Sequence, residues 1–561
     1  MRDGYEFDEK KDPLIGVSGI AMLLCLIFRV PLMSVIGAEG IAFFAPVNEL
    51  YLITIAFVSG GFSLTTMSML KYRIGREQYR NAARLFRVAR VIVALFSLAV
   101  TLFIIIGHRY ISTTLFNQDF SRLALLAIVP AVIMMTFVSL LRGYFEGMGT
   151  HYPTAHSLIL EQAFTIVLGV LMAAYFLDYG EKVAVILHDG RYAPAYGAFG
   201  AALGICAAAV ISLLHLTVIY LMYRGTFQRQ VYRDNSRQRE MASTIYRTFL
   251  MLSIPAGIFI VIDRVGVLVD QRIFYHFALL KDMGAGEEGV YGMTQVWGNY
   301  YGIFLVVVGV LTVLIALLFA HAANNITVSW MREEYGAVRS QLTQTFSLLC
   351  VAAIPLAVLT AVLAEPLVMA IGQGDKEIAV PLLQAGSAMI FLSTFAIFWI
   401  DILRRFKKTL MLTFLVIGGF IVHIGTLLIL MYTAGEQIQT AQQLITRVIV
   451  ANLIGAAFVF VSGLILVARC LKLRGNWIFG SLRTVIVSIL CSAIIGLLSV
   501  LLVWLFMDML GSHVTIIICF AVMTILYPAL MMVLRGLSVN ELEHLPGGQY
   551  LIRLGRRFGA L

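Results

Sequence analysis

The stretch Leu14-Ile-Gly-Val-Ser-Gly-Ile-Ala-Met-Leu-Leu-Cys-Leu-Ile-Phe-Arg-Val-Pro-Leu-Met-Ser-Val-Ile-Gly37 is apolar apart from its serines and one arginine, Arg29. It is long enough to cross the hydrocarbon core of a bilayer, which takes about 20 residues of helix. A guanidinium keeps its charge at physiological pH, and placing it at membrane depth costs at least ~3 kcal/mol unless it faces water or a counter-charge. The stretch therefore predicts a transmembrane helix that faces a polar interior, which is typical of transporters.

The whole composition agrees with this first helix. Hydrophobic residues make up 60% of the 561 residues and charged residues 13%, and the mean hydropathy is +0.90. Apolar runs of membrane-spanning length lie near 14–37, 42–70, 88–108, 121–141, 153–177, 195–223, 244–269, 295–322, 342–364, 378–403, 409–433, 445–468, 484–507 and 513–534. We therefore predict an all-α polytopic membrane protein with about 14 transmembrane helices.

The chain shows no sign of secretion or of a cofactor. Its first thirteen residues are charged and contain no small-residue cleavage pattern, so we expect the first helix to remain as an anchor. No C-x-x-C pair occurs, which argues against a metal site, and the position of every cysteine in or beside an apolar span argues against disulfides. These cysteines are Cys25, Cys206, Cys350, Cys470, Cys491 and Cys519. We expect no cofactor and no metal.

Lysine and arginine set the expected orientation. One alternate set of loops is basic and carries Lys71, Arg73, Arg76, Arg80, Arg84, Arg87, Arg90, Arg224, Arg229, Arg233, Arg237, Arg239, Arg404, Arg405, Lys407, Lys408, Lys472, Arg474 and the tail. The other set carries little beyond Arg109, Lys182, Arg191, Lys281 and Lys376. The positive-inside rule then places both termini in the cytoplasm. The net charge of +10 favours contact with anionic membrane lipids, and no nucleic-acid module is present.

Basic stretches divide the spans into two halves. We predict a six-helix lobe over 1–223, a cytoplasmic basic linker over 224–243, a second six-helix lobe over 244–470, and two extra helices with a cytoplasmic tail over 471–561. Arg29-Val30 and Arg264-Val265 lie 235 residues apart, each in the first helix of its half. Two related bundles that meet at a central cavity are a common transporter architecture, in which the substrate is held between the halves.

Charged residues lie at similar depths in the two halves. Arg29 is eight residues before Gly37, Glu49 eight after the outer start of its span at 41, and Arg264 eight before 272. At ~1.5 Å per residue each lies roughly 12 Å below the outer surface. We predict that Arg29–Glu49 and Arg264–Asp263 pairs rest there and release two guanidiniums to an anion. The alternative is structural ion pairing, although buried pairs gain little stability over apolar packing, and two arginines suit bidentate phosphate binding.

Other polar residues have less specific interpretations. Glu39 and Asp270 are placed nearer the outer rim, where we expect gating or ion coupling. Glu161 suits a cation or proton site as well as it suits helix packing. Histidines such as His423 are expected to be packed or interfacial, and the segment 297–301 (Trp-Gly-Asn-Tyr-Tyr) is expected to form an aromatic belt at the outer side. The sequence contains no catalytic motif, so no enzyme is expected.

Several motifs resemble one membrane-protein family. They are Phe28-Arg-Val-Pro-Leu32, Ile36-Gly-Ala-Glu-Gly40, Ala83-Arg-Leu-Phe-Arg87, Arg142-Gly-Tyr-Phe-Glu-Gly-Met148 with Glu161-Gln162, Leu363-Ala-Glu-Pro-Leu367 and Leu537-Ser-Val-Asn-Glu-Leu-Glu-His-Leu-Pro546. Together they resemble the polysaccharide-export and lipid II flippase branch of the multidrug/oligosaccharidyl-lipid/polysaccharide (MOP) exporter superfamily. The closest likeness is to the fourteen-helix Gram-positive proteins related to the stage V sporulation protein.

The resemblance implies a V of two six-helix lobes, alternating access, and a bacterial, Gram-positive plasma-membrane location. Its implied substrate is an undecaprenyl-pyrophosphate-linked oligosaccharide, such as lipid II or a capsule repeat unit, moved from the inner to the outer leaflet. By position, pyrophosphate binding falls on Arg29 and Arg264 and a gating role on Glu39. A monomer is compatible with this function.

One segment departs from the family, and two other functions stay open. Where relatives show a Gln-Gly-x-Gly-Lys-like turn, this chain has Trp399-Ile-Asp-Ile-Leu-Arg-Arg-Phe-Lys-Lys408, which leaves the second lobe's cytoplasmic gate and the glycan unassigned. A multidrug or metabolite antiporter of the same fold would favour an acidic cavity for cationic drugs. A glycan polymerase would need a large outer catalytic loop, and the longest outer loops, near 178–194 and 270–294, are short.

Overall fold

The computed structural model describes residues 13–234, 239–280, 287–372, 374–433, 440–471 and 476–536. All regular elements in these ranges are helices, and three of them (η1–η3) are short π-helical segments. The first part of the chain forms α1 (Pro13–Ile27), α2 (Arg29–Phe57), η1 (Val58–Ser63), α3 (Leu64–Ile74), α4 (Tyr79–Tyr110), η2 (Ile111–Leu115), α5 (Ser121–Ala127), α6 (Val129–Gly147), α7 (Tyr152–Leu187) and α8 (Tyr192–Arg233).

The rest of the described chain is equally helical, which confirms the all-α fold class. It forms α9 (Ala242–Arg264), α10 (Gly266–Leu280), α11 (Glu287–Asn299), η3 (Tyr300–Phe304), α12 (Leu305–Leu318), α13 (Ala320–Met331), α14 (Tyr335–Val362), α15 (Ala364–Ile371), α16 (Lys376–Gly386), α17 (Ala388–Arg405), α18 (Thr409–Thr433), α19 (Ala441–Cys470) and α20 (Asn476–Val533).

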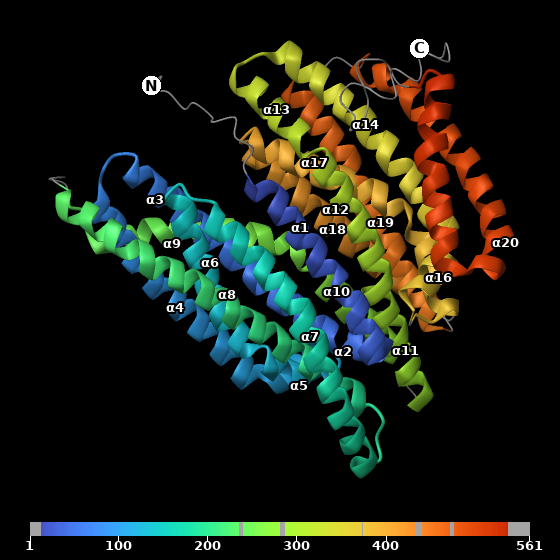
Figure 1. The fold of residues 1–561 in the computed structure, drawn as a ribbon, viewed down its shortest axis with the longest axis horizontal. Coiled ribbons are helices and arrows are strands. Elements are labelled where there is room, and N and C mark those ends of the chain that lie inside the picture. Colours follow the sequence, from blue (N-terminus) through green and yellow to red (C-terminus); the bar gives the residue numbers. More distant parts are fainter. Residues whose placement is uncertain are drawn as a thin grey trace.

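The number of membrane-crossing helices is lower than expected when continuous stretches are counted. The described chain has 11 such stretches, or up to 12 if the bent pair α16–α17 is one span, so the count of 14 is not confirmed. Two stretches contain a glycine with positive φ, Gly37 (φ 69°) and Gly511 (φ 78°). An uninterrupted α20 would be roughly 87 Å long, far more than a bilayer core, and the chain instead folds back at Gly511 into a hairpin (Figure 1). The sequence scan counts each crossing of the membrane separately, whereas one continuous helical stretch can contain two crossings.

The helices form two groups, with α2–α9 on one side and α11–α20 on the other (Figure 1). Two helices lie along the boundary: α1 packs on both α7 and α12, and α10 packs on both α2 and α19. The α20 hairpin lies at the outside of the second group, against α14 and α15. The first helix of the first expected half, α1, and the second helix of the second expected half, α10, therefore lie at the boundary between the groups.

Helix α9 packs closely on the first group although it follows the expected linker. A Cβ on Gly61 of η1 would lie 2.6 Å from the carbonyl oxygen of Ser253, and one on Gly257 would lie 2.7 Å from the ring of Phe57. Only glycine permits this approach, because any larger residue would overlap backbone or ring atoms. The second expected lobe thus begins with a helix that rests on the first group.

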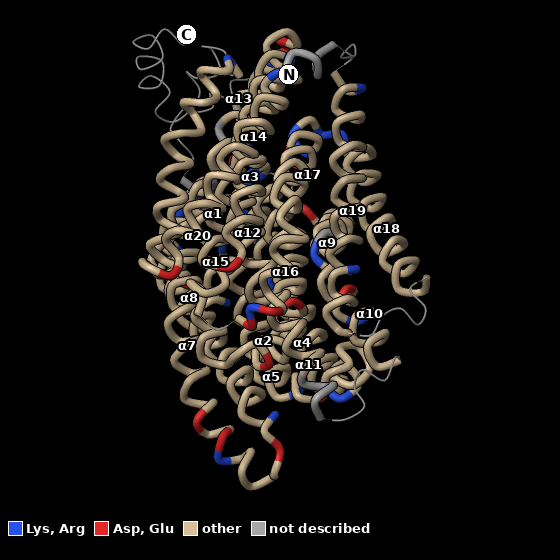
Figure 2. The backbone as a smooth tube through the Cα atoms, turned by 90° about the vertical axis from the view of Figure 1, so that its right-hand side faces the viewer, with Lys and Arg blue, Asp and Glu red and all other residues tan. Residues whose placement is uncertain are grey.

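The basic loops gather at one end of the bundle, which we name the α3–α13 end; the opposite end is the α5–α11 end (Figures 1 and 2). At the former, Arg405 of α17 donates to Asn324 of α13, and Arg73 of α3 pairs with Glu240 at 2.5 Å. Helix α8 continues to Arg233, past the expected start of the linker at 224. Asp234 then accepts a hydrogen bond of 2.7 Å from the backbone N–H of Arg80, so both flanks of 235–238 are anchored on the first group.

Candidate functional site

Arg29 lies where the first membrane stretch breaks. Helix α1 ends at Ile27 and α2 begins at Arg29. The guanidinium is 5% exposed, and its Nη2 lies 3.1 Å from Glu49 Oε1, later on the same helix α2. This confirms that the predicted Arg29–Glu49 contact exists. A permanent cation and its counter-charge therefore sit together inside the apolar bundle, where such a pair needs close hydrogen bonding to offset desolvation.

Tyr301 of the second group covers this ion pair. Its ring centroid lies 3.8 Å from the guanidinium carbon of Arg29, and its hydroxyl donates to Glu49 Oε1 at 2.5 Å. The same hydroxyl accepts a hydrogen bond of 2.9 Å from Asn48 Nδ2, and the backbone oxygen of Tyr301 accepts from Arg29 Nη1 at 3.4 Å. One residue of η3 thus holds three residues of the first group.

A π-helical turn places Tyr301 in this position. Segment η3 separates α11 from α12, and π-helical turns are frequent at functional sites because they rotate the side chains that follow. We expected Trp297, Tyr300 and Tyr301 to form an aromatic belt facing lipid, and this was wrong: each is at most 1% exposed. Their aromatic surface is buried between helices, as the ring contacts of Trp297 with Phe274 and Tyr300 also show.

Arg264 differs from Arg29 in its surroundings. It ends α9 and is exposed, whereas the side chain of Asp263 lies outside the described residues, so the expected Arg264–Asp263 pair is neither seen nor excluded. In this conformation Tyr301 covers the guanidinium of Arg29.

An apolar groove begins beside Arg29. Its lining includes Ile27 and Val30, which flank Arg29 in the sequence, and its cavity volume is about 240 Å³. The opposite walls come from α12, α14, α15 and α20, through residues such as Leu311, Leu363 and Phe520. Residues on either side of Arg29 in the sequence thus line an apolar pocket together with helices of the second group, while the side chain of Arg29 contacts Glu49 and Tyr301.

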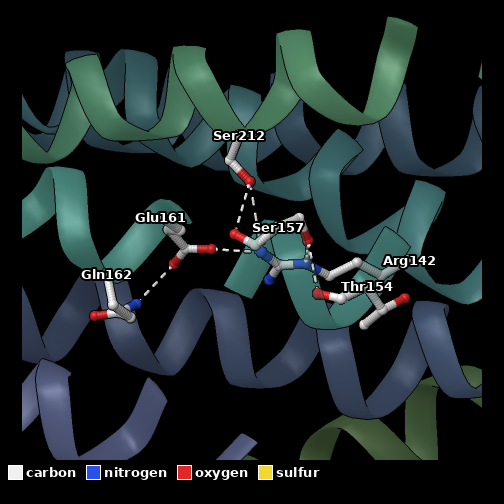
Figure 3. Close-up of polar contacts among 6 residues, drawn as sticks. All are labelled: Arg142, Thr154, Ser157, Glu161, Gln162 and Ser212. Atoms are coloured by element: carbon white, nitrogen blue, oxygen red, sulfur yellow. Dashed lines mark hydrogen bonds and ion pairs between the residues drawn. The ribbon is translucent and has the colours of Figure 1, made fainter. Parts of the chain in front are cut away.

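Glu161 belongs to a closed polar network inside the first group (Figure 3). Its Oε2 accepts from Arg142 Nη2 at 2.7 Å, and Arg142 Nε donates to Ser157 Oγ at 2.8 Å. Ser212 of α8 lies 3.5 Å from the same guanidinium. The network connects α6, α7 and α8, and both charged residues are at least nine-tenths buried. Of the two interpretations offered for Glu161, this arrangement favours helix packing.

The two remaining acidic residues lie in different surroundings. Glu39 lines a cavity of about 570 Å³ at the boundary between the groups, with Gln295, Asn299 and Asp375. Asp270, expected nearer the same rim, is buried among helices. It is 2% exposed and lies inside the second group, where His423 Nε2 is 3.0 Å from its Oδ1 and Asn452 Nδ2 donates to its Oδ2 at 2.9 Å.

The loops that we expect on the outer side contain no large catalytic domain among the described residues. Most of 178–194 belongs to the α7–α8 hairpin, and the described part of 270–294 belongs to α10 and α11. In the α7–α8 turn, hydrogen bonds from Arg191 lower the pKa of Asp189, so this short turn is closed by its own ion pair at 2.8 Å. These segments give no support to a glycan polymerase.

Polar contacts also join the groups at the α5–α11 end. Gln118, before α5, donates to the hydroxyl of Tyr275 on α10 and accepts from Gln271 at 3.5 Å. Arg272 donates to Asn117. Together with the contacts of Tyr301, these hydrogen bonds hold the two groups together at the α5–α11 end, which we call the closed state.

Changing Tyr301 to phenylalanine should loosen the closed state moderately. The variant keeps the ring over Arg29 but removes the hydroxyl shared by Glu49 and Asn48. Losing a hydrogen bond to a charged group costs roughly 1.5–3 kcal/mol, so the ratio of closed to open molecules should fall about tenfold or more. Spin labels at the exposed positions Leu115 and Leu280, in a variant without its native cysteines, would measure the populations by their distances. An unchanged distribution would contradict the bridging role of the hydroxyl.

Solved structures share this fold. One, described as the inward-facing conformation of a multidrug resistance MATE family transporter of the MOP superfamily, aligns with a TM-score of 0.62 at 13% identity, over 83% of this chain and 100% of the other. A second, described as MATE in complex with MaD3S, aligns with a TM-score of 0.53 at 14% identity, over 82% and 98%. The chain has the fold of the MOP superfamily. At these identities the likeness concerns the fold alone.

Two curated proteins of Bacillus subtilis (strain 168) are similar in sequence to this MOP-fold chain. Stage V sporulation protein B is 25% identical over 215 residues, which are 38% of this chain and 39% of that protein. The uncharacterized membrane protein YabM is 26% identical over 294 residues, half of each chain. The alignments thus span half or less of these relatives. No family model matches the chain. The similarity to stage V sporulation protein B agrees with the branch that the motifs indicated.

Proposed function

We propose that this multi-pass membrane protein is a flippase for an undecaprenyl-pyrophosphate-linked oligosaccharide. One observation carries the proposal: Arg29, a permanent cation between the two helix groups, is adjacent in sequence to residues that line an apolar groove. A lipid-linked pyrophosphate has the same two parts, an anionic head and a long hydrocarbon tail. A guanidinium binds phosphate through parallel hydrogen bonds, and the groove offers the tail an apolar path.

In the proposed cycle the pyrophosphate competes with Glu49 for Arg29. The closed state keeps the guanidinium occupied by Glu49 and Tyr301. Separation of the groups withdraws Tyr301, since it belongs to the second group, and uncovers the guanidinium. Arg264, already exposed at the end of α9, is the second proposed contact for the diphosphate. Both termini are proposed to lie in the cytoplasm, so transport would run from the inner to the outer leaflet.

Variants of the two arginines test this proposal. Proteoliposomes that carry a fluorescent, short-chain polyprenyl-pyrophosphate disaccharide would report its movement between leaflets. Arg29→Gln should slow movement about tenfold or more, because a hydrogen bond to a charged group contributes roughly 1.5–3 kcal/mol. Arg264→Gln should also slow movement. Arg29→Lys should retain part of the rate, since lysine keeps the positive charge but lacks the planar guanidinium that donates two parallel hydrogen bonds.

The control is Arg109→Gln, an exposed arginine near the end of α4, which should transport like the wild type. Equal rates for Arg29→Gln and the wild type, at equal amounts of folded protein, would refute the anion-binding role.

The alternative function is a multidrug or metabolite antiporter, and the specific reason to keep it is that the aligned solved structure is described as a multidrug resistance transporter. Expression in an efflux-deficient strain would separate the two functions. The flippase should leave susceptibility to cationic drugs unchanged, whereas an antiporter should raise resistance. The buried pairing of Arg29 with Glu49 leaves this site without the uncompensated carboxylate that a cationic drug would need.

A further inference from the structure

A polar cavity between the two groups takes no part in the proposed flippase site. Its volume is about 570 Å³. Helix α2 of the first group contributes Glu39, and the second group contributes Asn299 at the end of α11 and Asp375 at the start of α16. Gln295, one turn before Asn299, lines the cavity as well. A ligand held by all of these residues would connect the two groups in the closed state.

Asn299 directs an unpartnered oxygen at this cavity. The residue is 0% exposed, and its Nδ2 donates to the backbone oxygen of Gln295 at 2.9 Å, which fixes the orientation of the amide. Its Oδ1 lies 3.3 Å from the position of a Cβ added to Gly374, which also lines the cavity. This oxygen has no hydrogen-bond partner among the described residues. Buried polar atoms nearly always have a partner, so Oδ1 indicates a ligand that donates a proton or carries positive charge.

Two carboxylates line the same cavity. Glu39 is half-buried, and unlike Glu49 and Glu161 it lies within ion-pair distance of no cation in the part of the chain that the structure describes. Asp375 is exposed and uses Oδ1 to cap α16, accepting from the backbone N–H of Glu377 at 3.0 Å. Its Oδ2 is left for a ligand. The cavity therefore combines two negative charges with a buried amide oxygen.

The neighbouring basic side chains do not neutralise these charges. Arg191, near the start of α8, is paired with Asp189 at 2.8 Å. Lys376 follows Asp375 in the sequence and is exposed. The described residues that line the cavity include no lysine, arginine or histidine. The surroundings thus favour a cationic ligand, and they would repel the pyrophosphate of the proposed substrate.

The donor atoms are those of a hard divalent cation. Carboxylate and amide oxygens, completed by water, are the ligands that Ca²⁺ takes in flexible geometry, whereas Mg²⁺ requires a stricter octahedron. Softer metals prefer the sulfur of cysteine or the nitrogen of histidine, and the described lining contains neither. The volume leaves room for several waters, each of which occupies about 30 Å³. Ca²⁺ therefore fits this set of ligands best.

The position of the cavity connects it with closing. Ala38, next to Glu39, also lines it, and a Cβ on Gly298 would lie 1.9 Å from the backbone oxygen of Ala38. The cavity thus adjoins a close backbone contact between the groups. Without a cation, the carboxylates of Glu39 and Asp375 repel each other across the boundary. Separation of the groups would also split the ligand set, because Glu39 belongs to the first group and the other donors to the second.

We propose that this cavity is a binding site for a divalent cation, best suited to Ca²⁺, and that its occupation stabilises the closed state through Glu39, Asn299 and Asp375. Extracellular modules bind Ca²⁺ with dissociation constants of about 10⁻⁴–10⁻³ M, and we expect this range for a site with two carboxylates. If the open state does not bind, Ca²⁺ at ten times its dissociation constant should raise the ratio of closed to open molecules roughly elevenfold.

The first test counts bound metal on the full-length protein. Mn²⁺ accepts the same oxygen ligands as Ca²⁺, and the electron paramagnetic resonance signal of free Mn²⁺ falls when the ion binds. In nanodiscs of phosphatidylcholine, which has no net charge, the protein should bind one Mn²⁺ that Ca²⁺ displaces. Glu39→Gln and Asp375→Asn should each weaken binding about tenfold or more, since even residues that only support metal ligands typically contribute 10- to 100-fold.

The variants include their own checks. Asparagine is as good an N-cap as aspartate, so Asp375→Asn keeps the start of α16 and tests the site even if a change at Glu39 impairs folding. The matched control is Glu377→Gln, which removes an exposed carboxylate from the same helical turn without changing the lining of the cavity. It should bind Mn²⁺ like the parent protein.

The second test measures the closed fraction with spin labels at Leu115 and Leu280 while Ca²⁺, which is diamagnetic, is added. The closed fraction should rise in the parent protein and in Glu377→Gln, and Asp375→Asn should require about tenfold more Ca²⁺. Three results would overturn the proposal: no saturable binding tenfold above the expected dissociation constants, unchanged binding in Glu39→Gln and Asp375→Asn, or binding that leaves the label distances unchanged. No lipid-linked glycan is present, so this proposal and the flippase proposal can fail separately.

Discussion

Replacing Gly298 with valine should hold the two helix groups apart at the α5–α11 end. A Cβ at this position of α11 would lie 1.9 Å from the carbonyl oxygen of Ala38 and 2.5 Å from its carbon. Both atoms belong to the backbone of α2, so no side-chain rotation can relieve the overlap. Overpacking of this kind typically costs about 1–3 kcal/mol, which corresponds to a loss of roughly 5- to 150-fold in the ratio of closed to open molecules.

The same helix provides the control for this prediction. A Cβ on Gly292 would meet no atom within 4 Å, so Gly292→Val carries the same loss of glycine freedom without the overlap. Distances between labels at Leu115 and Leu280 should lengthen in Gly298→Val and stay unchanged in Gly292→Val. Transport should fall with the closed population if closing at this end belongs to the cycle. A Gly298→Val protein that keeps the parent distance distribution would show that α11 and α2 do not form the closing contact.

Removing one member of the Arg142–Glu161 pair should destabilise the protein strongly. In Glu161→Met the guanidinium of Arg142 would stay buried with only serine hydroxyls as partners. Breaking a buried ion pair typically costs about 3–5 kcal/mol, whereas replacing both partners by apolar residues of similar volume is often neutral. We therefore expect Glu161→Met and Arg142→Met to unfold at lower temperature in detergent, and the double variant to recover most of the loss.

This double-mutant cycle also separates the two interpretations of Glu161. If Glu161 serves only to join α6, α7 and α8, the double variant should regain transport together with stability. If it is an ion-coupling residue, the double variant should be stable but inactive. A single variant as stable as the parent would show that the network does not hold the first group together.

The Arg29–Glu49 pair could be predicted from the positions of charged residues within single apolar segments of the sequence. Both residues stood out because they interrupt apolar stretches, and the break at Gly37 inside α2 allows the two parts of this helix to bring them together. The partners of Arg142 could not be predicted in this way, because Glu161 and Ser212 belong to other helices. Spacing along one helix does not show which neighbouring helix packs against it.

Tyr301 and Asp270 have partners that no local pattern indicates. An aromatic residue near the end of a membrane helix is most often at the lipid interface, and only the π-helical turn of η3 brings Tyr301 onto Glu49, 252 residues away. Asp270 looked peripheral because of its distance from the end of the apolar run. Asn452, 182 residues away, and His423 give it a buried site, and neither pairing has a local signal.

Hydrophobic patterning is enough to predict that this protein is a bundle of membrane-spanning helices with a few charged residues inside. Hydrophobicity and the absence of free backbone groups in hydrocarbon act over each single segment of about 20 residues, so they can be read without knowing its neighbours. Only the packing of the helices shows which charges face each other, that Tyr301 covers Arg29, and that the apolar groove is lined by sequence neighbours of Arg29. Those arrangements depend on how helices hundreds of residues apart pack, because a side chain's partner is set by the helix against which it lies.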